Sequence, residues 1–225
     1  MKTPVSLPAL MLGLALASPV KAQDVAAYLQ GGISGIGLGV SMGWGGPFRV
    51  RADLINSYSR DLNGTRAGVP YAGTLKLSDS GIYVDYYPNG AGFRLVGGLM
   101  LNQSKIDLQA SAATGASAQI NGRTYALTGA DAVNAQVKYP SVMPYLGIGW
   151  GMGDRDKGFT FIADLGVGFG KATGTLNASP SLRGKITSAG LNADDELSAS
   201  RSQLQDEVAK AGYYPVLRIG VGYKF

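Results

Sequence analysis

The residues that could do chemistry in this chain are charged side chains, because two of the most reactive residue types are missing. The sequence contains neither histidine nor cysteine. Without histidine it has no Ser-His-Asp triad, no histidine metal cluster and no imidazole acid–base group near neutral pH. Without cysteine it has no disulfides. No serine or carboxylate constellation replaces them, so we expect no enzymatic activity, no metal and no cofactor.

The charged residues stand at alternate positions in otherwise apolar segments. Successive side chains of a strand point to opposite faces, so these charges oppose an apolar face. An isolated ion in a dry interior is very costly, and charges enclosed there must pair. The predicted network consists of Arg49, Arg51, Asp53, Asp85, Arg94, Asp164, Arg218 and Lys224.

Two interpretations of this network stay open. In the first, salt bridges close the interior. In the second, the interior is a narrow channel that weakly prefers anions, because the set holds five basic and three acidic residues. Glycines on the same face leave space for such a channel, namely Gly35, Gly37, Gly39, Gly98, Gly147 and Gly149.

The C-terminal segment from Tyr213 to Phe225 shows most clearly which element carries these charges. Its apolar face is formed by Leu217, Ile219, Val221, Tyr223 and Phe225, and Arg218 and Lys224 lie on the other face. A strand of an outer-membrane barrel turns its apolar face to lipid and its polar face to the lumen. The alternation therefore favours a transmembrane antiparallel up-and-down β-barrel. A soluble β-sandwich is the alternative.

The N-terminus indicates export. Lys2 is followed by an apolar run from Val5 to Ala17, and Val20-Lys21-Ala22 supplies small residues before a predicted cleavage after Ala22. The apolar run is too short for a spanning helix, which needs about 20 residues. Removing 22 of the 225 residues leaves 203 for one barrel domain, residues 23–225, and the net charge falls from +5 to +3. This mild charge gives no reason to expect nucleic-acid binding.

Short turns and long polar connections alternate along the chain. Short turns are predicted at 45–47, 88–92 and 151–158, and long loops at 60–73, 105–137 and 170–212. Such barrels keep short turns in the periplasm, long loops outside, and aromatic girdles at both interfaces. The expected girdle residues at the short turns and at the C-terminus are Trp44, Phe48, Tyr87, Phe93, Trp150, Phe159, Tyr223 and Phe225.

The strand count is ambiguous from the sequence. Seven strands are clear, and single-chain bacterial barrels have an even number. The segment from Asp24 to Gly31 supplies an eighth strand, whereas an additional strand within 170–187 would favour ten. Eight is our prediction, with ten as the alternative.

Two further elements are expected in the long loops. A hairpin is predicted at 118–125 around Asn121-Gly122. A short helix is predicted from Asn192 to Lys210, with three acidic residues in its first turns. We expect the helix at the barrel rim or partly in its mouth, with a recognition element or partial plug as the alternative.

The signal, the alternating strands and the terminal Tyr223-Lys224-Phe225 resemble small outer-membrane barrels of Proteobacteria, the OmpA/OmpX/OmpW-like group. The segments 57–61, 144–150 and 214–216 are similar to a largely uncharacterised branch of it. The resemblance implies an outer-membrane protein with a structural or surface-interaction role. Its implied partners are outer-membrane lipid, the barrel-assembly machinery at the strand ending in Phe225, and an extracellular ligand at the long loops. It assigns no catalytic residue.

Overall fold

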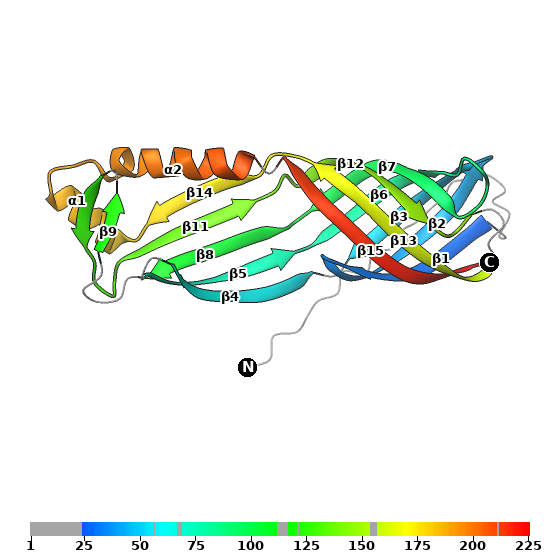
Figure 1. Ribbon diagram of the computed structural model, residues 1–225, viewed down its shortest axis with the longest axis horizontal. Coiled ribbons are helices and arrows are strands. Elements are labelled where there is room, and N and C mark those ends of the chain that lie inside the picture. The colour runs from blue at the N-terminus through cyan, green and yellow to red at the C-terminus, as the bar shows by residue number, and fades with distance from the viewer. Residues whose placement is uncertain are drawn as a thin grey trace, which may run out of the picture.

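The computed structural model describes residues 24–55, 57–66, 69–111, 117–120, 122–153, 157–210 and 212–225. Eight antiparallel strands close into a barrel (Figure 1). Around it they follow the order β1 (Val25–Gly32), β15 (Tyr213–Lys224), β13 (Gly158–Phe169), β12 (Val142–Trp150), β7 (Phe93–Asn102), β6 (Asp79–Tyr86), β3 (Phe48–Ile55) and β2 (Gly35–Gly45). The predicted eight-stranded barrel is confirmed. The predicted signal peptide, residues 1–22, lies outside the described residues.

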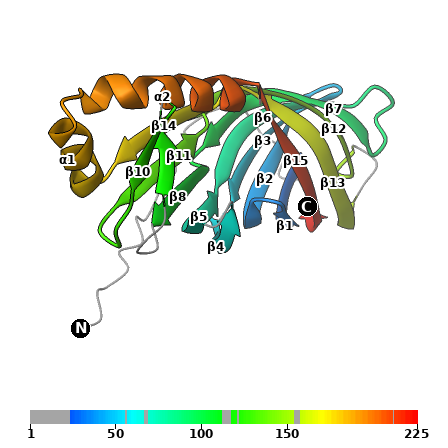
Figure 2. The ribbon, with the colours of Figure 1, turned by 60° about the vertical axis from the view of Figure 1, so that its left-hand side comes forward.

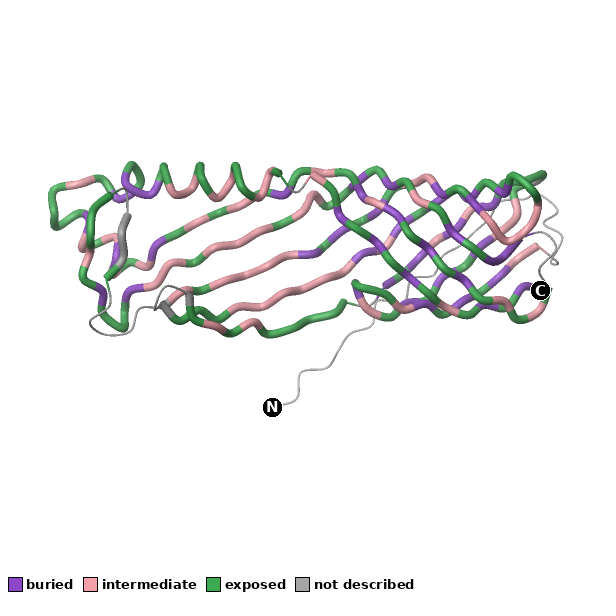
Figure 3. Tube along the Cα trace, in the orientation of Figure 1, coloured by how far each residue is buried: buried purple, intermediate pink, exposed green. Residues whose placement is uncertain are grey.

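The period-two pattern of the sequence becomes an alternation of burial along each barrel strand (Figure 3). In β15, Val216 and Arg218 point inward and are buried, whereas Leu217 and Ile219 are exposed on the outside. Large apolar side chains thus cover the outer surface of the barrel, whereas the charged side chains point into its interior together with buried tyrosine, methionine and valine. This is the reverse of a water-soluble sheet, where apolar side chains face the core.

The segment after Asp24 provides the missing strand. β1 runs from Val25 to Gly32 and pairs with both β2 and β15, which closes the barrel. The competing candidate within 170–187 does contain a strand, β14 (Thr173–Ala178). It pairs with another strand outside the barrel, however, and so does not raise the barrel count to ten.

The first two predicted long polar loops are largely strand, and the third, 170–212, holds one strand and two helices. Beyond one end of the barrel lies a five-stranded antiparallel sheet, here called the extension sheet (Figure 1). Its strands, in spatial order, are β14 (Thr173–Ala178), β11 (Ala132–Lys138), β8 (Lys105–Ser111), β5 (Val69–Leu77) and β4 (Tyr58–Arg66). The barrel's strand pairing continues into this sheet: Asp79↔Asn102 of the barrel and Lys76↔Lys105 of the extension share one register.

The two faces of the extension sheet differ in polarity. One face carries Ile106 and Leu108 and continues the inner face of the barrel; the other carries Lys105 and Asp107 and continues its outer face. Polarity therefore inverts where the barrel ends. An apolar outer surface, as on the barrel, is favourable against hydrocarbon. A polar outer surface, as on the extension sheet, is favourable against water.

A hairpin and one helix lie at the far end of the extension sheet, and a second helix runs from there along the sheet toward the barrel (Figures 1 and 2). The predicted hairpin is confirmed by β9 (Ser117–Ile120) and β10 (Arg123–Ala126). The predicted helix is α2 (Ala193–Ala209), with Asn192 as its N-cap. The sequence analysis missed α1 (Pro180–Ser188), which begins with a proline after the N-cap Ser179. No helix in the described ranges is both long and apolar enough to cross a membrane.

Helix α2 packs along strand β14, so its expected position at the rim or in the mouth of the barrel is wrong. Leu204 and Val208 lie over Gly174, where an added β-carbon would be crowded. Gln205 accepts a hydrogen bond from the backbone N–H of Gly174 (2.9 Å), and Arg201 donates to the carbonyl of Leu176 (2.9 Å). The helix thereby covers an edge strand whose backbone groups would otherwise be free to pair.

A small apolar core holds the helices in place. Leu182 and Ile186 of α1 and Leu197 of α2 are buried together in it. Beside it the buried Asp131 accepts hydrogen bonds from Lys185 and Thr128. Burial by itself raises the pKa of Asp131, but the hydrogen bonds from these two residues outweigh burial and hold the pKa below its ordinary value.

Candidate functional site

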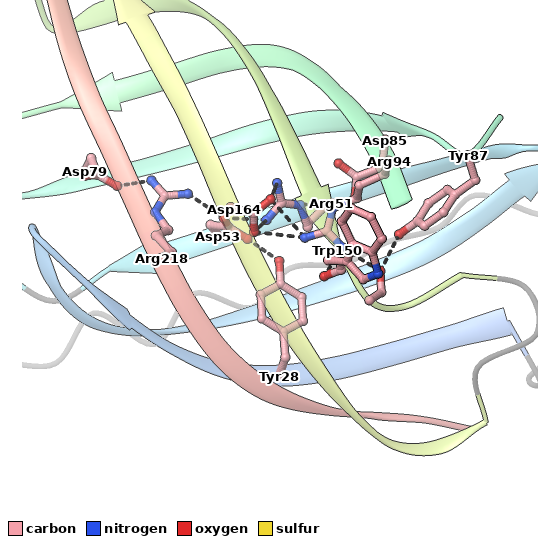
Figure 4. A network of polar contacts seen from close by, with 11 residues as sticks. Tyr28, Arg51, Asp53, Asp79, Asp85, Tyr87, Arg94, Trp150, Asp164 and Arg218 are labelled. Atoms are coloured by element: carbon pink, nitrogen blue, oxygen red, sulfur yellow. Dashed lines mark hydrogen bonds and ion pairs between the residues drawn. The ribbon is translucent and has the colours of Figure 1, made fainter. Parts of the chain in front are cut away.

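Asp164 on β13 is the centre of a buried charge network inside the barrel (Figure 4). Both of its oxygens accept hydrogen bonds from Nη2 of Arg94, each at 2.9 Å. The same carboxylate accepts from Arg51 at 3.0 and 3.4 Å. One carboxylate therefore joins β13 to β3 and β7. Such charge-assisted hydrogen bonds fix geometry more strongly than neutral ones.

The two arginines are held by further partners. Nη1 of Arg94 donates to the carbonyls of Gly151 (2.6 Å) and Trp150 (3.2 Å). Arg51 lies 3.2 Å from carboxylate oxygens of both Asp53 and Asp85, and its guanidinium sits 4.9 Å from the centre of the Tyr83 ring. A guanidinium over an aromatic face gains a cation–π contact. Both side chains are thus fixed from several sides.

A second group of charges continues the network toward the extension sheet. Arg218 on β15 donates to Asp53 (2.8 Å) and to Asp79. The hydroxyl of Tyr28 donates to Asp53, and that of Ser34 to Asp79. Every one of these carboxylates and the arginine is buried. The network therefore extends along the barrel axis.

A third group lies at the short-turn end of the barrel. Arg49 forms a 2.7 Å ion pair with Asp24, whose side chain is 44% exposed. Lys224 donates to the carbonyl of Gly153 (3.1 Å) and lies 3.6 Å from Asp24. The structure thus places all eight predicted charges inside the barrel, where seven meet at least one carboxylate or guanidinium partner within 3.2 Å.

The sequence analysis missed two acids of this network, Asp24 and Asp79. Asp79 is the first residue of β6 and lies on its inward face, whereas the sequence pattern places the start of this strand at Ile82. Extending the alternation three residues toward the N-terminus identifies Asp79 as inward-facing. With both acids counted, the charged inward-facing residues of the described barrel are five basic and five acidic. The positive excess that favoured an anion-preferring channel is therefore absent.

Layers of large side chains lie on either side of the charges. Met100, Met143, Tyr145 and Tyr214 pack together toward the extension sheet. Tyr28, Met152 and Ile162 pack together toward the short turns. Neutral packing of this kind keeps water away from the central charges. Oppositely charged groups attract one another more strongly in such an environment than in water.

Several inward glycines make room for neighbouring side chains. An added β-carbon at Gly39 would overlap the ring of Tyr28, and one at Gly98 would crowd Tyr83. At Gly149 it would come within 2.6 Å of both Arg94 and Asp164. Glycine is required where another group approaches the backbone this closely.

The predicted aromatic girdle lies on the outside of the short-turn end, with one exception. Trp44, Trp150 and Phe159 are exposed there, as are Phe48, Tyr223 and Phe225, and Phe93 is half-buried against Trp150. Tyr87 is buried, and its hydroxyl donates to the carbonyl of Gly151 (3.1 Å), so its assignment to the girdle is wrong. The exposed neighbour Tyr86 packs against Phe48 instead, because alternation places it on the outer face.

Within the described ranges, no group of three or more acidic residues is arranged to hold a metal ion. The carboxylates of the network are occupied by guanidinium groups. The arrangement can hold the strands of the barrel together.

Comparison with known proteins supports the fold. No family model matches the sequence, and no curated protein sequence matches it. The crystal structures of CarO and CarO2 from Acinetobacter baumannii are similar, with TM-scores of 0.56 and 0.58. Each is 16% identical to this chain, over 90% of this chain and 98% of the other. At this identity the similarity concerns the fold alone.

Proposed function

We propose that the protein is an integral outer-membrane barrel, exported by residues 1–22, that anchors the extension sheet at the cell surface as an interaction platform. The observation that carries this proposal is the inversion of polarity along continuous strands. Leu99 and Leu101 point outward on β7, and Lys105 and Asp107 point outward on β8 directly beyond them. An apolar band that gives way to polar residues fits a wall that leaves a bilayer.

A closed lumen is the second part of the proposal. An eight-stranded barrel is only wide enough for its side chains to fill the interior. Here ten paired charges and two layers of tyrosine and methionine occupy it. An ion crossing this lumen would have to break several buried charge pairs. The barrel would therefore serve as a rigid anchor.

A narrow channel is the second candidate. Several buried polar atoms lack a hydrogen-bond partner among the described residues, including both side-chain atoms of Gln30 and the hydroxyls of Tyr83 and Tyr145. Buried polar groups without protein partners are commonly satisfied by water. A chain of such waters would offer a path for small solutes. The balanced charges give that path no preference for anions.

Planar-bilayer conductance separates the two candidates. We expect no conductance steps from the purified, folded barrel, because the lumen is filled. Arg94→Ala and Arg51→Ala would open space within it, and Arg60→Ala, at an exposed position of β4, is the matched control. Steps from the unmodified protein that change in the two lumen variants but not in the control would refute the closed lumen and establish the channel.

The partners follow from the same proposal. Outer-membrane lipid would surround the barrel, and the barrel-assembly machinery would recognise β15 with its exposed terminal Phe225. A ligand would bind at the extension sheet, and the role involves no catalysis and no nucleic acid. Membership of the OmpA/OmpX/OmpW-like group is part of this proposal, supported by the shared eight-stranded barrel.

A further inference from the structure

Three lysines form a row across the outward face of the extension sheet. Lys76 on β5 pairs in register with Lys105 on β8, and Lys105 pairs with Lys138 on β11. Like charges directly opposite one another on neighbouring strands are destabilising. Lys105 has a compensating contact to Asp107 at 2.7 Å. Lys76 and Lys138 form no ion pair with any described residue, so the lysine row carries uncompensated positive charge.

The height of the lysine row follows from the uninterrupted register between barrel and extension. Leu101 is exposed on the outer face of the barrel, and Lys105 stands four residues further along the same chain. At about 3.4 Å per residue this is ~14 Å along the strand, or ~10 Å along the membrane normal for a strand tilted by about 40°. A hydrocarbon core of about 30 Å within a bilayer of 40–45 Å leaves a headgroup layer of about 5–7 Å on each side. The backbone of Lys105 therefore stands just beyond the headgroups, and its long, flexible side chain can extend back to them.

Above the lysine row, the same face carries two rows of side chains that are neutral or acidic and, apart from Ala72, polar. The first row, across five strands, is Asp61, Thr74, Asp107, Gln136 and Thr175. The second row is Asn63, Ala72, Gln109, Asn134 and Asn177. These two rows line a cavity of about 670 Å³.

The polar rows have free hydrogen-bonding capacity. In the first row, Gln136 donates to Asp107 at 2.5 Å, which orients both groups. In the second row, the side-chain amides of Asn63, Gln109 and Asn134 form no hydrogen bond with any described residue. Each amide offers donors and an acceptor in one plane. Adjacent strands space these groups about 4.8 Å apart, which suits the hydroxyls of a sugar.

A smaller cavity of about 310 Å³ links the two features. It shares Gln136 and Thr175 with the larger cavity and extends past Lys138 to Ser141, toward the barrel. A single elongated molecule lying along this path would meet a lysine first and the polar rows next. Phosphate at the headgroup level followed by sugar further from the membrane is the chemistry that matches this order.

We propose that the outward face of the extension sheet docks a phosphorylated glycolipid of the outer leaflet, with the lysine row on its phosphates and the polar rows on its sugars. This inference rests on the proposed outer-membrane location. It makes the extension sheet a contact surface for the surrounding leaflet as well as a platform for partners. It also accounts for the like charges that face one another across three strands.

Lipid binding is measured by native mass spectrometry of the full-length folded protein in detergent. The probes are bisphosphorylated lipid A, dephosphorylated lipid A, core-bearing lipopolysaccharide and phosphatidylglycerol. A basic residue near an anionic headgroup contributes about fivefold in affinity, so Lys76→Gln/Lys138→Gln should weaken binding of bisphosphorylated lipid A about 25-fold. The control Lys157→Gln/Lys210→Gln removes the same charge elsewhere and should bind like the unmodified protein.

The polar rows are tested separately with Gln109→Ala/Asn134→Ala. This variant should lose about tenfold in affinity for core-bearing lipopolysaccharide and bind bisphosphorylated lipid A unchanged. Equal affinity of the lysine variant and its control for bisphosphorylated lipid A would overturn the inference. Equal binding of phosphatidylglycerol, together with no effect of the polar-row variant, would overturn the glycolipid assignment in favour of a general anionic-lipid surface.

Flotation with vesicles measures whether the protein integrates into a membrane, independently of which lipid it prefers. A protein that floats with vesicles but does not discriminate among the four lipids overturns the glycolipid inference alone. A protein that does not integrate overturns the membrane assignment, and the glycolipid inference with it. If the lysine variant binds bisphosphorylated lipid A more weakly than its control and still floats with vesicles, the glycolipid inference and the membrane assignment are both supported.

Discussion

Removal of the Asp164 carboxylate is the most informative perturbation of the barrel interior. Asp164 accepts bonds from Arg94 at 2.9 Å to each oxygen and from Arg51 at 3.0 and 3.4 Å. In Asp164→Ala the nearest remaining acid to Arg94 is Asp85, 3.6 Å from Nε. The interior would hold five positive and four negative charges. Breaking one side of a buried ion pair costs about 3–5 kcal/mol, and we expect a loss of that size here.

The loss is measurable by denaturant unfolding of the folded barrel in detergent, followed by tryptophan fluorescence. Both tryptophans, Trp44 and Trp150, lie on the outer surface of the barrel and report its integrity. The control Asp206→Ala removes an exposed acid of α2 and should change the free energy of unfolding by less than about 0.5 kcal/mol.

A double variant tests the reason for the effect. Asp164→Ala/Arg94→Met restores the balance of charges and replaces the guanidinium by an apolar side chain. The loss in free energy of unfolding should be about 2 kcal/mol smaller in the double variant than the sum of the losses in the two single variants. The reason is that neighbouring residues in one network are energetically coupled. A loss below about 1 kcal/mol in Asp164→Ala, or strict additivity in the double variant, would refute the account of a tightly paired interior.

Three further predictions concern packing, pH and the helices. Gly39→Ala should lower the free energy of unfolding by about 1–3 kcal/mol in the same titration, because the new methyl group overlaps the Tyr28 ring; an unchanged midpoint would contradict this. The folded pKa of Asp131 lies below its ordinary value of 3.8, so its contribution to helix docking is present above that pH and is lost as the pH falls further. Hydrogen exchange of α1 should therefore accelerate below about pH 4, and Asp131→Asn should remove this pH dependence. Leu197→Ala should cost about 2–3 kcal/mol in the local stability of α2 by hydrogen exchange and leave barrel unfolding unchanged, since its buried side chain belongs to the apolar core beneath the helices, which holds no barrel residue.

The barrel was predictable because its strands follow a simple rule, with apolar side chains at successive outward positions. Alternations such as Leu217, Arg218 and Ile219 therefore identify both the strand and its inner face. The same rule located the buried charges Arg51, Arg94 and Asp164 without any knowledge of their partners. The rule failed at Tyr87. This residue stands between the end of a strand and a turn, so its place in the alternation was not clear from the sequence.

The extension sheet was missed although its strands also alternate. Ile106 and Leu108 alternate with Lys105 and Asp107, but the mean composition of the wider segment is polar and predicts a loop. An antiparallel sheet with one face in water also alternates cleanly between polar and apolar side chains. Attention to phase instead of average polarity would have found β8.

The sequence by itself determined the apolar outer face, the absence of histidine and cysteine chemistry, and eight of the ten charges that point inward, because these depend only on residue type and a period of two. Tertiary structure alone decided which charges meet, since Asp164 and Arg51 are 113 positions apart in the chain. It also decided that the acids balance the bases, that tyrosine rings fill the spaces left by glycines, and that three lysines line up on neighbouring strands. Each of these depends on strand register, which the closure of the barrel and the continuity of its ladders fix across distant segments.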